Sequence, residues 1–250
     1  AEKETAGNRH YRDSTLKLRQ AIDAFNREKV DFCIELGDFV DKGRSVEVEL
    51  DYLETIEAEY ARFKGERHYV IGNHDVATFS KKQLIDNCAA KKNYYSFDKG
   101  KFHFVVLDAC YNKDESDYNA GNFHWTETYI PSFEREWLKK DLSETSKKTV
   151  LFVHQRFDDE DGAHGVKNAP LVRQILEDSE KVLAVFQGHD HRGAHSCING
   201  IHYCTIQALV EGPGMKNYAY SRVHIGEIVS LESVGFGHQI DRIFNHPSSE

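Results

Sequence analysis

Four short apolar runs in this sequence each lead to a side chain that can bind a metal ion. They are residues 32–36, 68–71, 149–153 and 182–186, and they lead to Asp38, Asn73, His154 and His189. Runs of this length and composition predict buried strands. Open α/β sheets bind ligands at the carboxyl ends of their strands. A single case would be an ordinary turn residue or a structural histidine, but four cases together favour one shared site.

The segments between these runs have the spacing of helices. Apolar residues recur at helical intervals in 18–25 and 53–63, with Asp13 or Ser14 predicted to cap the first helix and Asn168 to cap a later one. Alternation of helix and strand predicts a parallel sheet. Turn signals at Asp98-Lys99-Gly100 and Asn199-Gly200 predict two hairpins, so antiparallel strands are expected as well. This pattern alone establishes an α/β or α+β fold.

Length and composition limit the possible classes of protein. With 250 residues the chain is expected to form a single domain, 1–250. A formal net charge of -9 opposes a broad nucleic-acid footprint, and no apolar run approaches the roughly 18 residues of a membrane span. Five cysteines without a Cys-x-x-Cys pair do not predict a disulfide framework. We favour the cytoplasm, with secretion or a periplasmic location open if an export signal preceded residue 1; the oligomeric state is left open.

Taken together, the motifs at the strand ends resemble those of the calcineurin-like metallophosphoesterase family. The matching motifs are Gly37-Asp38-x-x-Asp41, Gly72-Asn73-His74-Asp75, His154 and Gly188-His189-Asp190-His191. The resemblance implies a four-layer α/β/β/α sandwich. It also implies a dinuclear-metal-dependent hydrolase of phosphate esters or nucleoside-diphosphate-type diphosphates, with a metal-bound hydroxide as the nucleophile.

The same resemblance assigns roles to the metal-competent residues. Asp38 would bridge two ions, Asn73, His154 and His189 would complete one ion, and His191 would bind the other. Nitrogen and oxygen ligands of this kind suit Mn, Fe, Zn or Co, with Mn favoured. His189 and His191 are two residues apart, so in an extended segment their rings would point the same way.

Two further residues are expected to serve the chemistry rather than the metals. His74 follows Asn73 and would protonate the leaving group, while Asp75 could hold the other ring nitrogen of His74. Asp41 and Asp190 are expected to order their loops.

One departure from the family pattern affects the second ion. The Asp-x-His motif that ends the first strand in the family does not occur before Asp38. We therefore expect that the sequence begins just after that strand and that the domain is N-terminally incomplete. The alternative is a depleted site in a non-catalytic metal-binding scaffold.

The family resemblance implies a small phosphorylated substrate, and a narrower resemblance concerns its class. Residues 8–14, Phe79-Ser80, Val223-His224 and Asp241-Arg242 resemble the manganese-dependent ADP-ribose/CDP-alcohol diphosphatases, and bacterial alkaline-phosphatase-like relatives share similar motifs. A broad-specificity alkaline phosphomonoesterase therefore stays open.

Three residues are candidates for substrate binding. Arg9 and Arg12 could pair with substrate phosphate, or form surface ion pairs instead. Trp125 lies in a polar, aromatic-rich loop over 109–130 and could stack on a base, although the aromatic residues of this loop could instead belong to the core.

Overall fold

The computed structural model of this protein is built around a six-stranded sheet; the structure describes residues 1–90, 92–226, 229–235 and 242–244. In order across this sheet, the strands are β5 (Tyr95–Lys99), β6 (Phe102–Val106), β7 (Lys148–Val153), β8 (Val182–Gln187), β10 (Ile201–Thr205) and β9 (Ala194–Ile198). The four inner strands are parallel, whereas β5 and β9 run antiparallel to their neighbours at the two edges. Strands β7 and β8 are almost wholly buried, as parallel strands covered on both faces usually are.

The remaining strands form smaller sheets. A parallel pair consists of β3 (Phe32–Glu35) and β4 (Glu66–Tyr69). Three antiparallel strands are β11 (Ala219–Ile225), β12 (Val229–Gly235) and β13 (Arg242–Phe244), and β1 (Thr5–Ala6) pairs with β2 (Arg9–His10) near the start of the chain. The helices are α1 (Tyr11–Glu28), α2 (Val46–Tyr60), the short 3-10 helix η1 (His74–Val76), α3 (Lys81–Asn87), α4 (Ser132–Glu144) and α5 (Ala169–Asp178).

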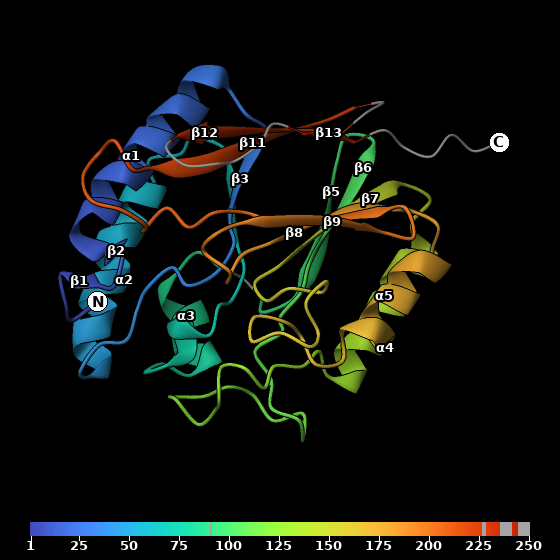
Figure 1. Ribbon diagram of the computed structural model, residues 1–250, viewed down its shortest axis with the longest axis horizontal. Coiled ribbons are helices and arrows are strands. Elements are labelled where there is room, and N and C mark those ends of the chain that lie inside the picture. Colours follow the sequence, from blue (N-terminus) through green and yellow to red (C-terminus); the bar gives the residue numbers. More distant parts are fainter. Residues whose placement is uncertain (91, 227–228, 236–241, 245–250) are drawn as a thin grey trace.

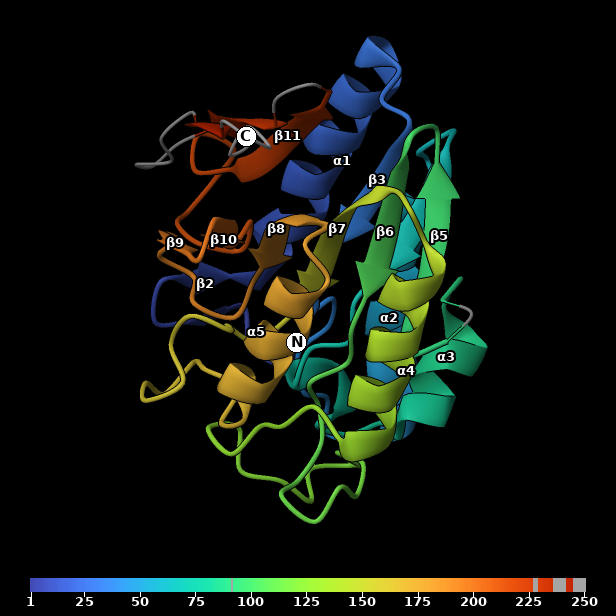
Figure 2. The ribbon, with the colours of Figure 1, turned by 90° about the vertical axis from the view of Figure 1, so that its right-hand side faces the viewer.

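The elements form four layers. Helices α4 and α5 cover one face of the six-stranded sheet, where Leu138 and Val172 pack in one cluster with Val185 (Figures 1 and 2). On the other face, Phe152 packs in a second cluster with Phe32 of β3. A further cluster joins α1 and α2 to β3 and β4. This order of helix, sheet, sheet and helix confirms the predicted four-layer sandwich.

Both predicted hairpins are present. Strands β9 and β10 flank Asn199 and Gly200, whose φ angles of 50° and 82° suit the type I′ turn that this dipeptide favours. Strands β5 and β6 pair on either side of Gly100. Asn199-Gly200 therefore sets the antiparallel edge beside β10.

The predicted cap of the first helix is wrong. Helix α1 begins at Tyr11, so Asp13 and Ser14 lie inside its first turn: the Asp13 carboxylate accepts the Gly214 N–H, and the Ser14 hydroxyl donates to the His10 carbonyl. Asn168 does precede α5, but its side chain bonds to Ile130 rather than to the helix.

The sequence reasoning also missed a short helix. Helix α3 has only seven residues and begins with a capping box in which Ser80 and Gln83 bond reciprocally. Asp241, which belongs to the Asp241-Arg242 pair of the narrower resemblance, lies outside the described residues. That the chain is one domain lacking its first strand stays a prediction.

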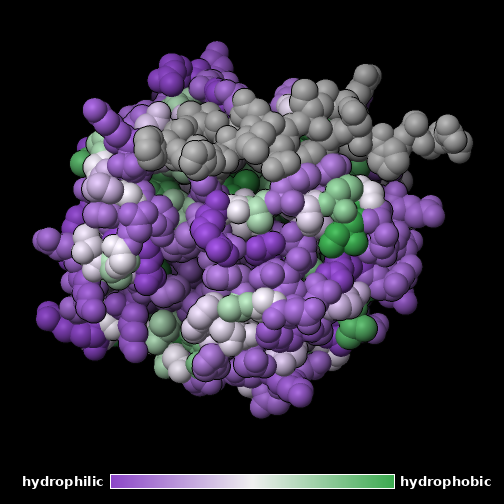
Figure 3. Space-filling model, viewed as in Figure 1, coloured by the Kyte–Doolittle hydropathy of each residue, from purple (hydrophilic) through white to green (hydrophobic). Residues whose placement is uncertain are grey.

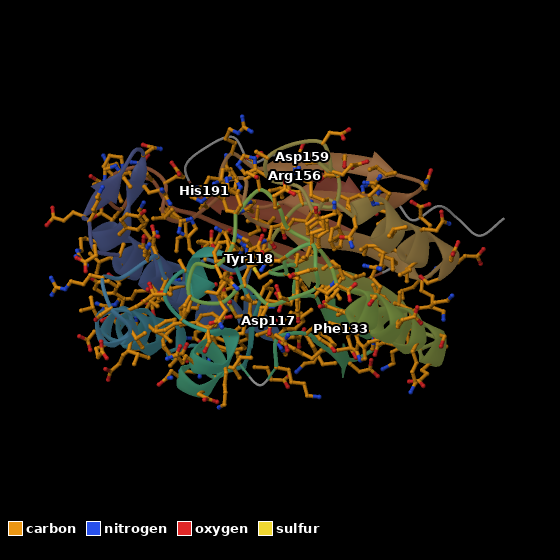
Figure 4. All side chains as sticks on the ribbon, turned by 90° about the horizontal axis from the view of Figure 1, so that it is seen from below. Asp117, Tyr118, Phe133, Arg156, Asp159 and His191 are labelled. Atoms are coloured by element: carbon orange, nitrogen blue, oxygen red, sulfur yellow. The ribbon has the colours of Figure 1, made fainter. Side chains whose placement is uncertain are left out.

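The segment 109–130 is the long loop that the sequence predicted. It contains isolated β-bridges but no helix or strand. One anchor is a buried ion pair, because the Lys81 Nζ atom lies 2.7 Å from Asp108 and 2.8 Å from Asp117. Tyr118 is wholly buried and labelled near the centre of Figure 4. The Lys81 ion pair and the buried Tyr118 therefore fix the loop to the rest of the fold.

The face of the molecule in Figure 3 is mainly hydrophilic, with hydrophobic side chains in small separate patches. None of the helices in the described part of the chain combines the length and the apolar character needed to cross a membrane.

Candidate metal centre

The ends of neighbouring strands bring the predicted ligands together. His154 directly follows β7, and His189 follows β8 after one glycine. Because Val153 pairs with Gln187 in the parallel register, the two histidines leave the sheet at the same edge, where the Gly188 N–H donates to the His154 carbonyl at 2.9 Å. Asp38 comes after β3 in the facing sheet.

Ligand atoms of Asp38, His154 and His189 all lie within 4.8 Å of one another. His154 Nδ1 is 2.6 Å from the Leu36 carbonyl oxygen, so that nitrogen carries the proton and Nε2 faces the cluster. His154 Nε2 lies 3.2 Å from Asp38 Oδ2 and 3.1 Å from His189 Nδ1. One carboxylate oxygen and two imidazole nitrogens therefore converge on a small space.

Tight backbone turns make this convergence possible. Asp38 and His189 have φ angles of 59° and 65°, in the left-handed region that Asp and His tolerate better than most residues. A Cβ atom on Gly37 would lie 2.5 Å from His154 Nδ1, and one on Gly72 would lie 2.3 Å from Asp38 Oδ1. Both glycines are therefore required by close approach at the centre.

An unsatisfied buried atom supports the fit of a cation. Asn73 Oδ1 is buried and has no hydrogen-bond partner among the described residues. Asn73 lies between Gly72 and His74, whose N–H donates to Asp38 Oδ1 at 2.8 Å. A buried polar atom without a partner is costly. A carboxylate, two imidazoles and an amide oxygen are ligands suited to divalent transition metals such as Mn.

The charges at the centre also favour metal binding. Burial, together with the charge of His154, lowers the pKa of His189 to about 3, so its imidazole is neutral near pH 7 and offers a lone pair. Burial would raise the pKa of Asp38, but the charges of His154 and His74 outweigh it and hold that pKa below the ordinary range. Asp38 is therefore ionised.

His191 lies outside the three-residue cluster but lines the same cavity as Asp38 and His189. Its Nδ1 atom is 2.6 Å from Glu211 Oε1. The two histidines lie in the loop that follows β8, where the positive φ angle of His189 interrupts the extended backbone. In Figure 4, His191 lies between helix α1 and the loop that carries Arg156.

Asp190 orders its loop, as predicted. Its carboxylate accepts hydrogen bonds from Arg156 at 3.0 Å and from Arg192 at 2.9 Å. Asp190 therefore holds together the loops that follow β7 and β8.

The partner of His74 differs from the prediction. His74 Nδ1 lies 2.6 Å from Asp41 Oδ1, whereas the Asp75 carboxylate accepts the N–H groups of Asp38, Val40 and Gly72. Helix η1 starts at His74 and turns Asp75 back toward the 38–40 loop. The prediction that Asp75 holds His74 is therefore wrong: Asp41 holds it, and Asp75 fixes the loops around the centre.

Two carboxylates set the charge of His74. The charge of Asp38 is the main influence that raises the pKa of His74 to about 9, against burial and with help from the hydrogen bond to Asp41. Bound cations would offset the influence of Asp38, but the bond to Asp41 would remain. Burial opposes ionisation of Asp41, yet the hydrogen bond and the charge of His74 lower its pKa below the ordinary value.

A cavity of about 410 Å³ adjoins the centre. Arg9 and Arg12 both line it; the Arg9 guanidinium lies 3.5 Å from Asp41, and that of Arg12 lies over the Tyr52 ring. Both arginines thus line the cavity. Arg9 also forms an ion pair with Asp41, which was the alternative role considered for it.

Trp125 is more exposed than Tyr111 and Tyr118, two other aromatic residues of its loop. Tyr111 and Tyr118 are buried, as the core interpretation predicted, whereas Trp125 is 41% exposed. Its ring centre is 5.6 Å from that of His189 and 5.7 Å from that of His164. Sequence reasoning missed His164, since it belongs to no motif and follows a polar stretch.

Comparison with known proteins identifies the family to which the chain belongs. A family model described as calcineurin-like phosphoesterase matches residues 10–193. A manganese-dependent ADP-ribose/CDP-alcohol diphosphatase from Oryza sativa subsp. japonica is 24% identical, over 90% of this chain and 84% of the relative. A protein of the same name from Homo sapiens is 25% identical, over 95% of this chain and 85% of the relative.

Among solved structures, a dimetal phosphatase from Danio rerio is similar in fold, with a TM-score of 0.84 and 21% identity over 98% of this chain and 95% of that one. The family model covers most of this chain, including every strand-end motif from Gly37 to His191. The chain therefore belongs to the calcineurin-like phosphoesterase family and is a hydrolase of the metallophosphoesterase type.

Proposed function

We propose that this chain is a manganese-dependent hydrolase that cleaves the diphosphate bond of nucleoside-diphosphate compounds such as ADP-ribose and CDP-alcohols. The observation that carries the proposal is the convergence of Asp38, His154 and His189 within 4.8 Å. The names of the relatives supply the substrate class.

In this proposal, Asp38, Asn73, His154, His189 and His191 would hold two manganese ions, with Asp38 as the shared carboxylate. Bound ions would neutralise phosphoryl charge and polarise the bond to be broken. The protein's own contribution is to hold these ligands in place, through the Leu36 carbonyl at His154 and the Glu211 carboxylate at His191.

His74 is proposed to protonate the leaving oxygen. Its Nδ1 atom is held by Asp41, which leaves Nε2 to face the cavity that His74 lines. A general acid must carry a proton near neutral pH and must lie within hydrogen-bond reach of the leaving group. The hydrogen bond to Asp41 supports the first requirement, and the position of His74 next to Asn73 supports the second.

Three side chains are proposed to bind the rest of the substrate. Arg9 and Arg12 line the cavity and offer paired N–H groups to phosphate oxygens. Trp125 presents an exposed ring beside His189 and could stack on the base.

The test compares substrates in the presence of Mn²⁺. ADP-ribose and CDP-choline should be hydrolysed with a lower KM than 4-nitrophenyl phosphate, and Trp125→Ala should raise KM for the nucleotides alone. Efficient hydrolysis of the small phosphomonoester, with no cleavage of the nucleotides, would instead identify a phosphomonoesterase. No hydrolysis at all, with one manganese ion or none per chain, would identify a metal-binding scaffold.

A further inference from the structure

His164 is a histidine at the candidate centre with no assigned role. Its ring centre lies 5.2 Å from that of His189 and 5.7 Å from that of Trp125. The side chain is partly exposed, and its ring nitrogens make no hydrogen bond to the described residues. His164 therefore brings unused hydrogen-bonding atoms to the edge of the metal cluster.

The backbone that carries His164 is firmly held. The Arg156 N–H donates to the His164 carbonyl at 3.0 Å, and the Val166 N–H donates to the Arg156 carbonyl at 2.8 Å. A Cβ atom on Gly165 would lie only 1.8 Å from the Asp159 carbonyl oxygen, so the close turn next to His164 requires glycine. Figure 4 shows Arg156 and Asp159, which belong to this loop, on the same side of the view as His191.

The same loop is tied to the loop that carries Trp125. The Lys167 N–H donates to the Thr128 carbonyl at 2.9 Å, and the Asn168 side chain bonds to both backbone groups of Ile130. His164 and Trp125 are thus presented by two loops fixed to each other. Little conformational freedom would be lost if His164 contacted a ligand.

The proposed substrate carries charged phosphate oxygens, which are strong hydrogen-bond acceptors. A neutral imidazole always carries one N–H donor and a protonated one carries two, so His164 can donate in either state. We propose that His164 is a substrate-binding residue that donates a hydrogen bond to a phosphate oxygen beside the metal centre. This inference rests on the proposed function, because it assumes a phosphorylated substrate at that centre.

Two other roles for His164 make different predictions. His164 could serve only as a ring that packs against Trp125 and His189, in which case any aromatic side chain would replace it. It could also be a metal ligand, in which case its loss would lower the metal content. Three variants separate these roles: His164→Phe keeps a ring without a donor, His164→Gln keeps a donor without a ring, and His164→Ala keeps neither.

The first measurement is calorimetric titration of the manganese-loaded proteins with inorganic phosphate, together with elemental analysis. We expect His164→Phe and His164→Ala to weaken phosphate binding by about ten- to a hundred-fold, the usual effect of losing a hydrogen bond to a charged group. His164→Gln should recover part of this loss. Manganese content should equal that of the unmodified protein in all three variants.

Two results would overturn the inference: phosphate binding unchanged in His164→Phe, which leaves only ring packing, or loss of manganese in all three variants, which indicates a ligand. The outcome is separate from that of the proposed function. If phosphate binding depends on His164 but ADP-ribose and CDP-choline are not cleaved, the proposed function fails and the inference stands. If the nucleotides are cleaved while phosphate binding does not depend on His164, the inference fails and the proposed function stands.

Discussion

At the scale of single residues, two carboxylates position His74, one through its ring and one through its backbone. Asp41 bonds to the His74 ring at 2.6 Å, and Asp38 accepts the His74 backbone N–H at 2.8 Å. The ring is therefore oriented from one side while the backbone is fixed to the metal-binding loop. Arg9 lies 3.5 Å from Asp41 and lines the same cavity as His74.

This arrangement predicts a leaving-group effect. His74→Ala should lower kcat by about 10²–10⁴-fold on a substrate with a poor leaving group, because that oxygen must be protonated as it departs. A 4-nitrophenyl ester, whose leaving group is stable as an anion, should lose much less. Steady-state rates on both substrates, with manganese content as the control, check this. Equal losses on the two substrates would mean that His74 only supports the loop.

At the scale of elements, the buried ion pair of helix α3 holds the 109–130 loop. The Lys81 side chain is 6% exposed and lies between Asp108 and Asp117. Asp108 is wholly buried, and its N–H donates to the equally buried Glu134. Removing the cation would leave buried carboxylates without compensation.

Lys81→Met should therefore lower the free energy of unfolding by about 3–5 kcal/mol. Lys82→Met is the matched control, because Lys82 is 82% exposed and pairs with Asp86 at the surface. The control should change stability by less than about 1 kcal/mol. Urea unfolding of both variants measures the difference, and equal stability of the two would show that the Lys81 pair contributes nothing.

The loop that carries His164 has an acid-sensitive anchor. Arg173 of α5 bonds to both oxygens of Glu160, at 2.7 and 2.9 Å. The hydrogen bonds from Arg173 are the main cause that lowers the pKa of Glu160 from its ordinary 4.5 to about 2. Because the folded-state pKa is depressed, the stabilisation is fully present above pH 4.5 and is lost as pH falls toward 2.

Glu160→Gln should accordingly lower stability at pH 7 by on the order of 1–2 kcal/mol once solvent screening is allowed for. The difference from the unmodified protein should shrink below pH 4 and vanish near pH 2. Thermal unfolding across this range measures it. Glu144→Gln, at a surface pair with Lys140, is the control and should show no such trend. A difference that does not depend on pH would contradict the assignment.

The sequence predicted the parts of the site that depend on strand ends. His154 and His189 follow neighbouring parallel strands, and Asp38 and Asn73 follow the paired strands β3 and β4, so the position of each in the chain sets its place in space. The partner of His74 was not predictable, because helix η1 rotates Asp75 away and brings Asp41 in.

Contacts between loops were also beyond the sequence pattern. Trp125 and Tyr118 belong to the same aromatic loop, yet one is exposed at the centre and the other is buried. His164 reaches the centre only through hydrogen bonds that tie two loops together. Such contacts depend on tertiary packing, which periodicity and turn signals do not encode.

At the scale of the whole molecule, the facing sheets meet at a cluster of buried carboxylates. Burial, with the charge of Asp38, raises the pKa of Asp75 to about 7, and burial with the charge of Asp75 raises that of Glu35 well above its ordinary value. Without cations, these acids oppose one another in a region that joins both sheets. Metal binding should therefore stabilise the entire fold.

Addition of Mn²⁺ at about 100 times its Kd should raise the free energy of unfolding by about 2.7 kcal/mol, and hence Tm by about 5–10 °C. A chelator should reverse the shift. Asp38→Asn should abolish most of it, because the shared carboxylate is lost. Scanning calorimetry at several manganese concentrations provides the measurement, and a Tm independent of manganese would show that the cluster does not bind it.

The left-handed backbone at Asp38 and His189 sets stability against activity. Asparagine adopts this conformation readily. At position 189 it would replace an imidazole whose charged form is disfavoured by burial and by His154, whereas at position 38 it would remove a carboxylate whose charge His154 and His74 stabilise. A library selected only for heat resistance without metal would be expected to accumulate asparagine at position 189 and to keep aspartate at position 38. Such a selection would remove one proposed metal ligand while leaving the proposed shared carboxylate in place.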